Sequence, residues 1–316
     1  MPDDSHHYPR IGIVIVTWNG KSLVLDCVKS LLKCTYPNFR ILVVDNASND
    51  GTVDALKAEF GDQIDVIVNS RNLMFAGGNN VGIRYFLDEN TDTNVMSGVL
   101  PRQLPTAQDV LSGVPTRQSS KVDWILLLNN DVEVDPGLLD GLVLVGESDS
   151  SIGIVGPKIY FWEPKDLIWF AGGKMSLSGR GSRHIGIRQT DRGQFDQIQD
   201  VDYVTGCALM IRHTVIEQIG LLDESYPMYN EDSDWCFRAR KSGYRVIYTP
   251  AGKLWHKISV SAGGQLSRFK IRNRLRSQWI FLKKYARWYH WLLMPFGSLI
   301  ELTRILCLIL LGKLKN

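Results

Sequence analysis

The sequence predicts an α/β fold, with a mostly parallel central sheet flanked by helices and a helical C-terminal tail. Apolar runs of strand length alternate with amphipathic segments of helix length, which is typical of parallel sheets joined by crossover helices. Residues 125–128 are apolar without interruption, which indicates a strand buried on both faces. This run ends in Asn129, Asn130 and Asp131, and open α/β sheets bind ligands at the carboxyl ends of such strands.

Composition and charge divide the chain of 316 residues into parts. With 44% hydrophobic and 22% charged residues, it is globular and not disordered. Residues 251–316 carry 13 Lys or Arg and one acid, a net charge of +12, whereas the first 250 residues carry −9. We expect a flexible N-terminus over 1–9, a domain over 10–264 with an insertion at 91–121, and a basic, apolar helical tail over 265–316.

The cysteines and the N-terminus bear on the compartment. The five cysteines form no C-x-x-C pair and no zinc-finger spacing, and the polar, acidic N-terminus does not resemble a signal peptide. We therefore expect reduced thiols in a cytoplasmic protein. The basic tail suits anionic lipid headgroups or nucleic acid. No recognised nucleic-acid-binding module accompanies it, so we expect no nucleic-acid partner.

The first half of the predicted sheet has, in order, a strand at 11–17, a helix at 23–32 and a strand at 40–44. The first strand stops at Thr17, before a turn that contains Asn19, and the second stops before Asp45 and Asn46. A strand, a helix and a strand in succession form a right-handed parallel crossover. Thr17 and Asp45 should therefore lie at the carboxyl ends of neighbouring strands.

The next elements expected are a helix at 52–60, a strand at 65–69 and a helix near 79–87. Gly77 and Gly78 would precede this last helix and let the backbone approach a bound group, while the helix start offers N–H donors to an anion. Residues 91–121 lack periodicity, and they form either a lid or an insertion without function.

Asp131 has two interpretations. It stands where a hard cation or a phosphate-bearing substrate is handled, with Asn129 on the same side of the strand. Alternatively, these residues only begin a turn before a helix at 136–145.

The second half of the sheet should add strands at 152–157, 201–211 and 244–248, with a short helix at 215–219. Glu231, Asp232 and Asp234 open a further helix, where acids favour the macrodipole and serve as ordinary capping. Partly apolar surroundings would instead raise the pKa of one carboxyl toward that of a general base. His256 follows a Trp and, taken alone, indicates a packed imidazole more than a ligand.

Together these segments resemble the family 2 glycosyltransferases, an inverting group with the nucleotide-sugar-binding GT-A fold. The resemblance covers about residues 10–275, and the matching segments occur in the family's order at 15–19, 43–52, 72–80, 128–131, 230–235 and 255–256. Within the family, the sequence is most similar to the bacterial rhamnosyltransferase-like enzymes of surface polysaccharide assembly. Arg272-Asn273-Arg274 also resembles their end segment.

The resemblance implies roles residue by residue. The residues implied in binding the nucleotide-sugar donor are Thr17, Asn19, Asp45, Asn46, Arg71, Asn72, Gly78, Asn129, Asn130 and Asp131. Asp131 also matches the last acid of the family's D-x-D metal motif, and His256 matches a metal-ligand position, so the implied cofactor is Mn²⁺ or Mg²⁺. Asp232 matches the catalytic base, with Glu231 beside it. Two positions depart from the family pattern, because Asn129 replaces the first acid of D-x-D and Met74 replaces a usual Gly.

The chemistry agrees with these roles. A diphosphate leaving group needs its charge neutralised, which a divalent cation held by Asp131 would do, and an adjacent imidazole favours Mn²⁺. Asp232 would take the proton of an acceptor hydroxyl as it attacks the anomeric carbon opposite the diphosphate, which inverts that centre. Asp45 can accept a hydrogen bond from uracil or thymine, so UDP and dTDP donors both remain open.

The tail interleaves basic and aromatic residues and then becomes apolar. Pro295, Glu301 and Arg304 interrupt what would otherwise span a membrane, so we expect two short amphipathic elements in the membrane interface, on the cytoplasmic face of the plasma membrane. The alternative is a helical pair packed on the domain or on a second subunit, which would make a homo-oligomer. We expect the acceptor pocket to comprise residues 160–205 and the tail.

These features predict a metal-dependent, inverting hexosyltransferase. It would move one sugar from dTDP-rhamnose or a UDP-hexose to a lipid-linked or saccharide acceptor in bacterial cell-surface polysaccharide assembly. One alternative is a processive polysaccharide synthase, but residues 284–288 lack the Gln of the Q-x-x-R-W motif of those enzymes. The other is a scaffold that binds nucleotide-sugar without turnover, against which Asp131, Glu231, Asp232 and His256 argue together.

Overall fold

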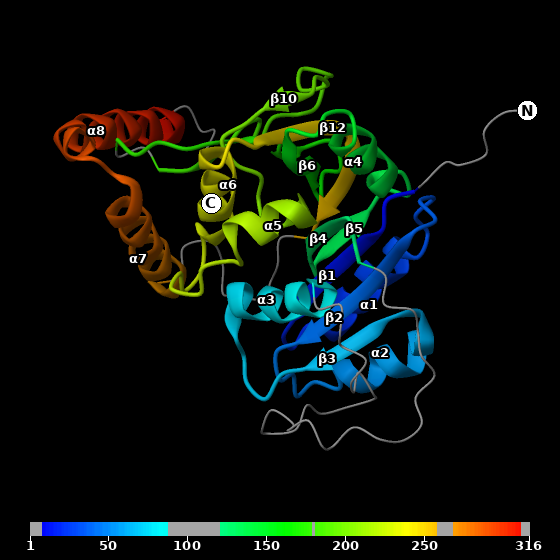
Figure 1. Ribbon diagram of the computed structural model, residues 1–316. Coiled ribbons are helices and arrows are strands. Elements are labelled where there is room, and N and C mark those ends of the chain that lie inside the picture. The colour runs from blue at the N-terminus through cyan, green and yellow to red at the C-terminus, as the bar shows by residue number, and fades with distance from the viewer. Residues whose placement is uncertain (1–7, 88–120, 179–180, 258–267, 311–316) are drawn as a thin grey trace, which may run out of the picture.

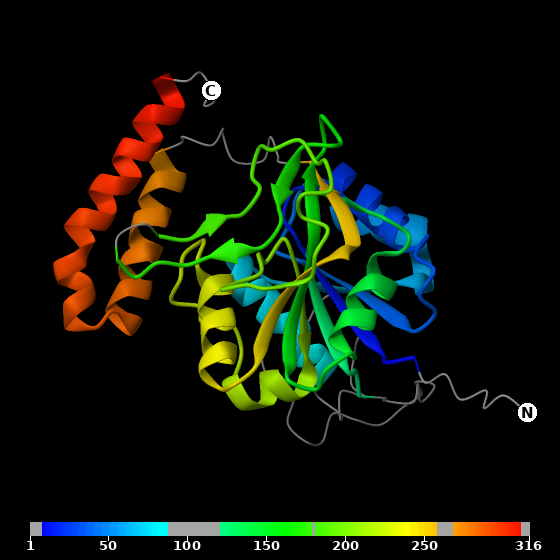
Figure 2. The same ribbon diagram turned by 90° about the horizontal axis from the view of Figure 1, so that it is seen from above.

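The computed structural model describes residues 8–87, 121–178, 181–257 and 268–310. Residues 1–7 of the predicted N-terminus and residues 91–120 of the predicted insertion lie outside this range. A single large mixed sheet has the strand order β10-β12-β6-β11-β4-β1-β2-β3. Helices cover both of its faces, and the two C-terminal helices lie at one end of the molecule (Figures 1 and 2).

The first half of the sheet is parallel, as the crossover pattern predicts. Its elements are β1 (Ile11–Thr17), α1 (Lys21–Leu31), β2 (Phe39–Asp45), α2 (Thr52–Phe60), β3 (Asp65–Val68), α3 (Met74–Leu87) and β4 (Trp124–Asn129). β1 pairs in parallel with both β2 and β4. Thr17 lies opposite Asp45 in this register, so the predicted neighbourhood of the two residues is confirmed.

The second half of the sheet is mixed. Its elements are β5 (Val132–Val134), α4 (Leu138–Gly146), β6 (Ile152–Phe161), β7 (Ile168–Phe170), β8 (Gly173–Lys174), β9 (Arg183–His184), β10 (Gln199–Asp200), β11 (Ala208–Arg212), α5 (His213–Ile219), α6 (Glu231–Lys241) and β12 (Arg245–His256). β11 runs antiparallel between β4 and β6, and β12 runs parallel to β6. The strand predicted at 201–211 is shorter in the structure, where it is β11, and the strand predicted at 244–248 is longer, where it is β12.

The prediction that the paired glycines precede a helix is wrong. α3 begins at Met74, so Gly77 and Gly78 lie in its first turns and are buried. A Cβ on Gly78 would lie 2.8 Å from Cγ1 of Val16 in β1 and 3.1 Å from Nδ2 of Asn46. Gly78 therefore lets α3 pack closely against the sheet, and this contact fixes the loop before α3.

The tail forms two helices. α7 (Arg268–Tyr285) packs on the body through Phe281 and Leu282, which are buried. α8 (Trp288–Leu310) runs through Pro295 without a break, so the prediction of two short elements there is wrong and one continuous helix takes their place. Proline lacks the N–H that would bond to the carbonyl one turn earlier in the helix. The neighbouring side chains are exposed, so water can bind this carbonyl instead. Among the described residues, no helix is long and apolar enough to cross a bilayer.

Candidate active site

The loops at the carboxyl edge of the sheet are joined by buried hydrogen bonds. Oγ1 of Thr17 accepts a bond of 2.9 Å from Nδ2 of Asn130. The N–H of Asn46 donates to the carbonyl of Thr17 at 2.8 Å, and its Nδ2 donates to the carbonyl of Met74 at 3.1 Å. Oδ1 of Asn46 accepts a bond of 2.9 Å from Asn69. The ends of β1, β2, β3 and β4 therefore form one connected edge. We call it the donor edge, because it contains residues expected from the sequence to bind the nucleotide-sugar donor.

Asp45 presents a buried carboxylate oxygen at the donor edge. Its Oδ2 accepts a bond of 2.8 Å from the N–H of Ser48, whereas Oδ1 has no hydrogen-bond partner among the described residues. Since buried acceptors are nearly always paired, an unpaired one marks a position for the N–H of a ligand. Asn19 holds the same loop, because its N–H donates to Oγ of Ser48 and its Oδ1 accepts from the N–H of Asn49, each at 2.8 Å.

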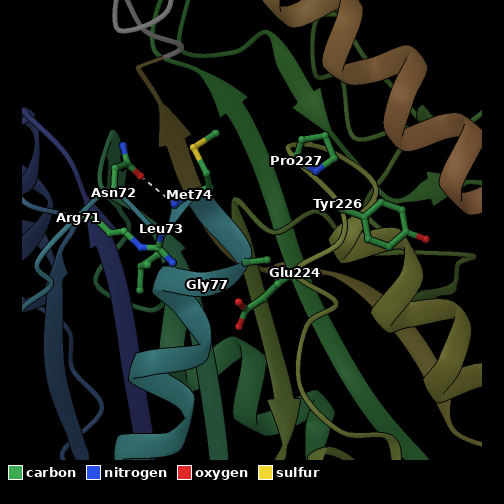
Figure 3. A pocket seen from close by; sticks show the side chains of 9 residues that line it. Arg71, Asn72, Leu73, Met74, Gly77, Glu224, Tyr226 and Pro227 are labelled. Atoms are coloured by element: carbon green, nitrogen blue, oxygen red, sulfur yellow. Dashed lines mark hydrogen bonds between the residues drawn. The ribbon is translucent and has the colours of Figure 1, made fainter. Parts of the chain in front are cut away.

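Left-handed backbone is concentrated around this edge. The non-glycine residues there with φ between 48° and 72° are Asn19, Ala47, Met74, Tyr229 and Asn230. Such conformations cost roughly 1–3 kcal/mol each and cluster at functional sites. Met74 stands where the family pattern has Gly, and its φ of 60° shows that it keeps a glycine-like backbone. Oδ1 of Asn72 accepts the N–H of Met74 at 2.8 Å and supports this turn (Figure 3).

A pocket of about 270 Å³ opens between the start of α3 and the loop before α6 (Figure 3). Arg71, Asn72 and Met74 line it from the α3 side, and Glu224 and Tyr226 line it from the other. Two of the predicted donor-binding residues, Arg71 and Asn72, therefore border a cavity that adjoins the donor edge.

Asp131 and His256 form a buried pair beside the donor edge. Nε2 of His256 lies 3.0 Å from Oδ1 of Asp131. The antiparallel pairing of β5 with β12 causes this contact, since it sets His256 opposite Val132, the residue after Asp131. Asn129, at the end of β4, lies two residues before Asp131 and opposite Val16 of β1.

Two neighbours of His256 were not predicted from the sequence. The Trp169 ring lies 4.6 Å from the imidazole in an edge-on arrangement, and the side chain of Cys207 interacts with it. Burial disfavours the charged imidazole, but interactions with Cys207 and Asp131 outweigh burial and raise the pKa of His256 to about 10. Nδ1 has no hydrogen-bond partner among the described residues. No local sequence pattern links Trp169 or Cys207 to His256.

Glu231, which is buried, and Asp232, which is partly buried, begin α6 as an acid pair. Oδ2 of Asp232 accepts a bond of 2.8 Å from the N–H of Gly206, and Oδ1 accepts one of 2.6 Å from the N–H of Ser233. Oε2 of Glu231 is buried without a hydrogen-bond partner in the described part of the chain. Burial, and then the charge of Asp232, raise the pKa of Glu231 to about 8. Burial also raises the pKa of Asp232. At neutral pH, Glu231 is therefore mostly protonated, and Asp232, which two backbone N–H groups hold, is the candidate for the base.

A dipeptide connects the acid pair to the Asp131–His256 pair. Gly206 holds Asp232 through its N–H. The next residue, Cys207, accepts a bond of 2.9 Å from the N–H of Asn129 and interacts with His256 through its side chain. The two candidate catalytic groups therefore lie on either side of one short backbone segment.

The third acid of the cluster, Asp234, has a structural role. It is fully buried and accepts hydrogen bonds from Tyr226 (3.1 Å), Arg238 (2.8 Å), Lys284 (2.6 Å) and Tyr285 (2.6 Å). Lys284 and Tyr285 belong to α7, so Asp234 joins the catalytic helix α6 to the tail. The acids at the start of α6 thus have two separate roles. Glu231 and Asp232 form the acid pair, and Asp234 joins α6 to α7.

This fold and this site define a class. A mixed α/β sheet whose edge carries a buried ligand acceptor, a carboxylate–imidazole pair and an acid pair has the GT-A architecture of enzymes that use nucleotide-sugars. A solved mannosyltransferase from Pyrobaculum calidifontis, in complex with GDP-Man and Mn²⁺, has the same fold, with a TM-score of 0.60 over 97% of this chain and 76% of that one, at 14% identity.

The family follows from the sequence comparison. Residues 9–290 match the family described as "Glycosyltransferase like family 2". The chain belongs to glycosyltransferase family 2 and is an inverting glycosyltransferase.

The relatives that match most of this chain include the following three. The low-salt glycan biosynthesis hexosyltransferase of Haloferax volcanii is 27% identical over 282 residues, covering 88% of this chain and 78% of the relative. The N-acetylglucosaminyl-diphospho-decaprenol L-rhamnosyltransferase of Mycobacterium tuberculosis is 23% identical over 291 residues, covering 88% and 86%. An uncharacterized protein of Sinorhizobium fredii is 29% identical over 287 residues, covering 89% of this chain but 28% of that protein's length.

Proposed function

We propose that this protein adds one sugar from a nucleotide-diphosphate sugar to a hydroxyl of a lipid-linked or oligosaccharide acceptor during glycan assembly. The observation that carries the proposal is the convergence of three features: the unpaired Oδ1 of Asp45, the Asp131–His256 pair and the base Asp232. The first suits the N–H of a pyrimidine base, the second suits a cation with a diphosphate, and the third suits an acceptor hydroxyl.

Asp131 and His256 would hold Mn²⁺ or Mg²⁺, and His256 would release its proton when the ion binds, because only the neutral imidazole is a metal ligand. Their ligand atoms lie 3.0 Å apart, close enough to bind one ion together. No group of three or more metal-ligating side chains occurs in the described ranges, so donor phosphate oxygens and water would supply the other ligands. The imidazole favours Mn²⁺. When bound, the ion would neutralise the charge that develops on the departing diphosphate.

The chain's own residues would perform the proton transfer. Asp232 is held by Gly206 and Ser233, so its carboxylate has a fixed direction. It would take the acceptor's hydroxyl proton as that oxygen forms the new glycosidic bond and the diphosphate leaves from the opposite face. A buried, ionisable base argues for turnover and against a binding scaffold.

The donor sugar is the finer part of the proposal. The two relatives with assigned activities are a hexosyltransferase and an L-rhamnosyltransferase that acts on a lipid diphosphate. We therefore propose dTDP-rhamnose or a UDP-hexose as the donor and a lipid-linked or saccharide acceptor.

The surface of α8 supports attachment to a membrane. Its exposed apolar side chains follow one another at helical spacing and include Trp288, Leu292, Phe296, Leu299 and Ile300. Basic residues of α7 flank them. Such a helix lies in the headgroup region with its apolar face buried. We propose that the enzyme binds peripherally to the cytoplasmic face of the plasma membrane.

A transfer assay tests the proposal. The protein is incubated with Mn²⁺, an N-acetylglucosaminyl-diphospho-lipid and either dTDP-rhamnose or UDP-hexoses. The proposal predicts a glycolipid product whose new anomeric centre is inverted relative to the donor, as read by NMR. Absence of product with all of these donors, from a protein that binds nucleotide, would contradict the proposed acceptor class.

A further inference from the structure

Helix α7 is fixed against the residues that precede the acid pair. Oγ of Ser277 donates to the carbonyl of Met228 at 2.8 Å, and Nδ2 of Asn230 donates to Oε1 of Gln278 at 3.2 Å. Ser277 is fully buried, and so is most of Asn273, one turn earlier. The intervening residue Arg274 is therefore carried by a backbone that is anchored on both sides.

The Arg274 guanidinium lies over the ring of Tyr229, 5.0 Å from its centroid. It also interacts electrostatically with the buried Tyr203 and the half-buried His184. Burial lowers the pKa of His184 to about 4, and the charge of Arg274 contributes to the decrease. This imidazole is therefore neutral at physiological pH and does not repel a cation. Arg274 thus lies against Tyr229, three residues before Asp232.

Arg274 differs from several cations near the acid pair, which form ion pairs with acids. Lys284 pairs with Asp223 and Asp234, Arg238 pairs with Asp234, and Arg240 pairs with Asp202. No ion pair joins Arg274 to an acid within the described part of the chain. A guanidinium that is positioned but not neutralised is suited to an anionic ligand, and its planar donors match phosphate oxygens.

The position of Arg274 relative to the base indicates which substrate it meets. The Tyr203 hydroxyl interacts with both Asp232 and Arg274. Burial and the charge of Asp232 raise its pKa, and the charge of Arg274 lowers it. Trp169 contacts His184 on one side and His256 on the other, each at 4.6 Å between ring centroids. Arg274 therefore approaches Asp232 from the side of α7 and Tyr229, whereas the cation pair is connected to Asp232 through Gly206 and Cys207.

We propose that Arg274 binds a phosphate of a lipid diphosphate acceptor and so holds the acceptor's sugar hydroxyl toward Asp232. This inference rests on the proposed function above. The apolar face of α8, the next helix after α7, would take up the lipid chain while Arg274 holds the phosphate. Arg274 is then a substrate-binding residue that the tail contributes to the active site.

Calorimetry with geranyl diphosphate tests this proposal. The titration is made in EDTA, so that the probe cannot bind through a divalent ion. We expect Arg274→Ala to weaken binding about 10- to 100-fold, the change that a charge-assisted hydrogen bond represents, and Arg274→Lys to recover part of the loss. The exposed Arg272 of the same helix supplies the matched control, since Arg272→Ala should bind as wild type does.

Further arms identify the ligand. Geraniol lacks the diphosphate and dihexanoylphosphatidylglycerol carries a single headgroup phosphate, and both should bind more weakly than geranyl diphosphate. Equal binding of either one overturns the proposal, as does an equal loss in Arg272→Ala or no loss in Arg274→Ala.

The donor provides the last comparison. UDP or dTDP with Mn²⁺ should bind Arg274→Ala and wild type equally, and a selective loss of nucleotide binding would assign the guanidinium to the donor instead. If wild type binds nucleotide but not geranyl diphosphate, this inference fails and the proposed glycosyl transfer stands. If wild type binds neither, both fail.

Discussion

Nε2 of His256 lies 3.0 Å from Oδ1 of Asp131, although 125 positions separate the two residues in the chain. The contact arises because β12 continues to His256 and pairs there with β5, which begins directly after Asp131. A carboxylate from the parallel half of the sheet thus meets an imidazole from the mixed half. The active site depends on this junction between the two halves.

Asp232→Asn should lower kcat by about 10²- to 10⁴-fold, because an amide cannot accept the acceptor's proton. The substitution keeps the shape of the side chain and an oxygen for the N–H of Gly206, so nucleotide affinity should not change. Steady-state kinetics and nucleotide titration measure the two effects. Ser233→Ala is the control, since it removes only a hydroxyl contact of 3.3 Å, and turnover near wild type in Asp232→Asn would exclude Asp232 as the base.

Glu231→Gln should change how stability depends on pH. The pKa of Glu231 is raised from 4.5 to about 8, so the folded protein keeps a proton that the unfolded chain releases above pH 4.5. The free energy of unfolding therefore falls as pH rises from about 4.5 to 8, by up to about 1.4 kcal/mol per pH unit from this group. Gln does not titrate, so the Tm of the variant relative to wild type should increase from pH 5 to pH 9.

An exposed glutamate provides the control for this pH dependence. Glu163→Gln should show the same Tm difference from wild type at every pH. A Glu231→Gln variant whose Tm difference stays constant between pH 5 and pH 9 would mean that Glu231 is ionised throughout this range.

Asp234→Asn should destabilise the fold by about 3–5 kcal/mol, because it leaves the charges of Arg238 and Lys284 without their buried partner. Thermal unfolding measures this loss. Asp223→Asn removes a more exposed contact to Lys284 and should cost at most about 1 kcal/mol. If Asp234→Asn unfolds at the wild-type temperature, the junction between α6 and α7 does not depend on this residue.

Leu292→Glu on α8 should reduce flotation with vesicles that contain anionic lipid, because it places a charge in the apolar face. Leu144→Glu is a matched control, since Leu144 on α4 is 70% exposed and Leu292 is 64% exposed. Full flotation of Leu292→Glu, or equal loss in both variants, would argue against α8 as the membrane-binding surface.

Much of the parallel half of the fold could be predicted from the sequence. Apolar runs and the turns after them locate β1, β2 and β4, and the crossover rule sets Thr17 beside Asp45. The end of β12 was not predicted, because Pro250 and Gly252 interrupt the strand pattern. The structure has a register shift between Thr249 and Lys253, after which pairing with β6 resumes and reaches His256.

The site could be predicted only where its residues stand in local patterns. Asp131, Glu231 and Asp232 follow a buried strand or open a helix, so their types and positions were informative. Trp169 and Cys207 reach His256 through tertiary packing, and nothing in their neighbouring residues indicates it. Asp234 shows the opposite case, since its local pattern resembles that of the acid pair while its partners lie on α7.

The most direct test of the account is the binding of UDP and dTDP by calorimetry, with and without Mn²⁺, to wild type and to Asp131→Ala. In the proposed site the chain would supply two ligands and the donor would supply phosphate oxygens, so Mn²⁺ and nucleotide should bind together. The account predicts tight binding of one nucleotide that requires Mn²⁺ and is lost in Asp131→Ala. Nucleotide binding that is equally tight without Mn²⁺, or unchanged in Asp131→Ala, would contradict a cation site at Asp131 and His256.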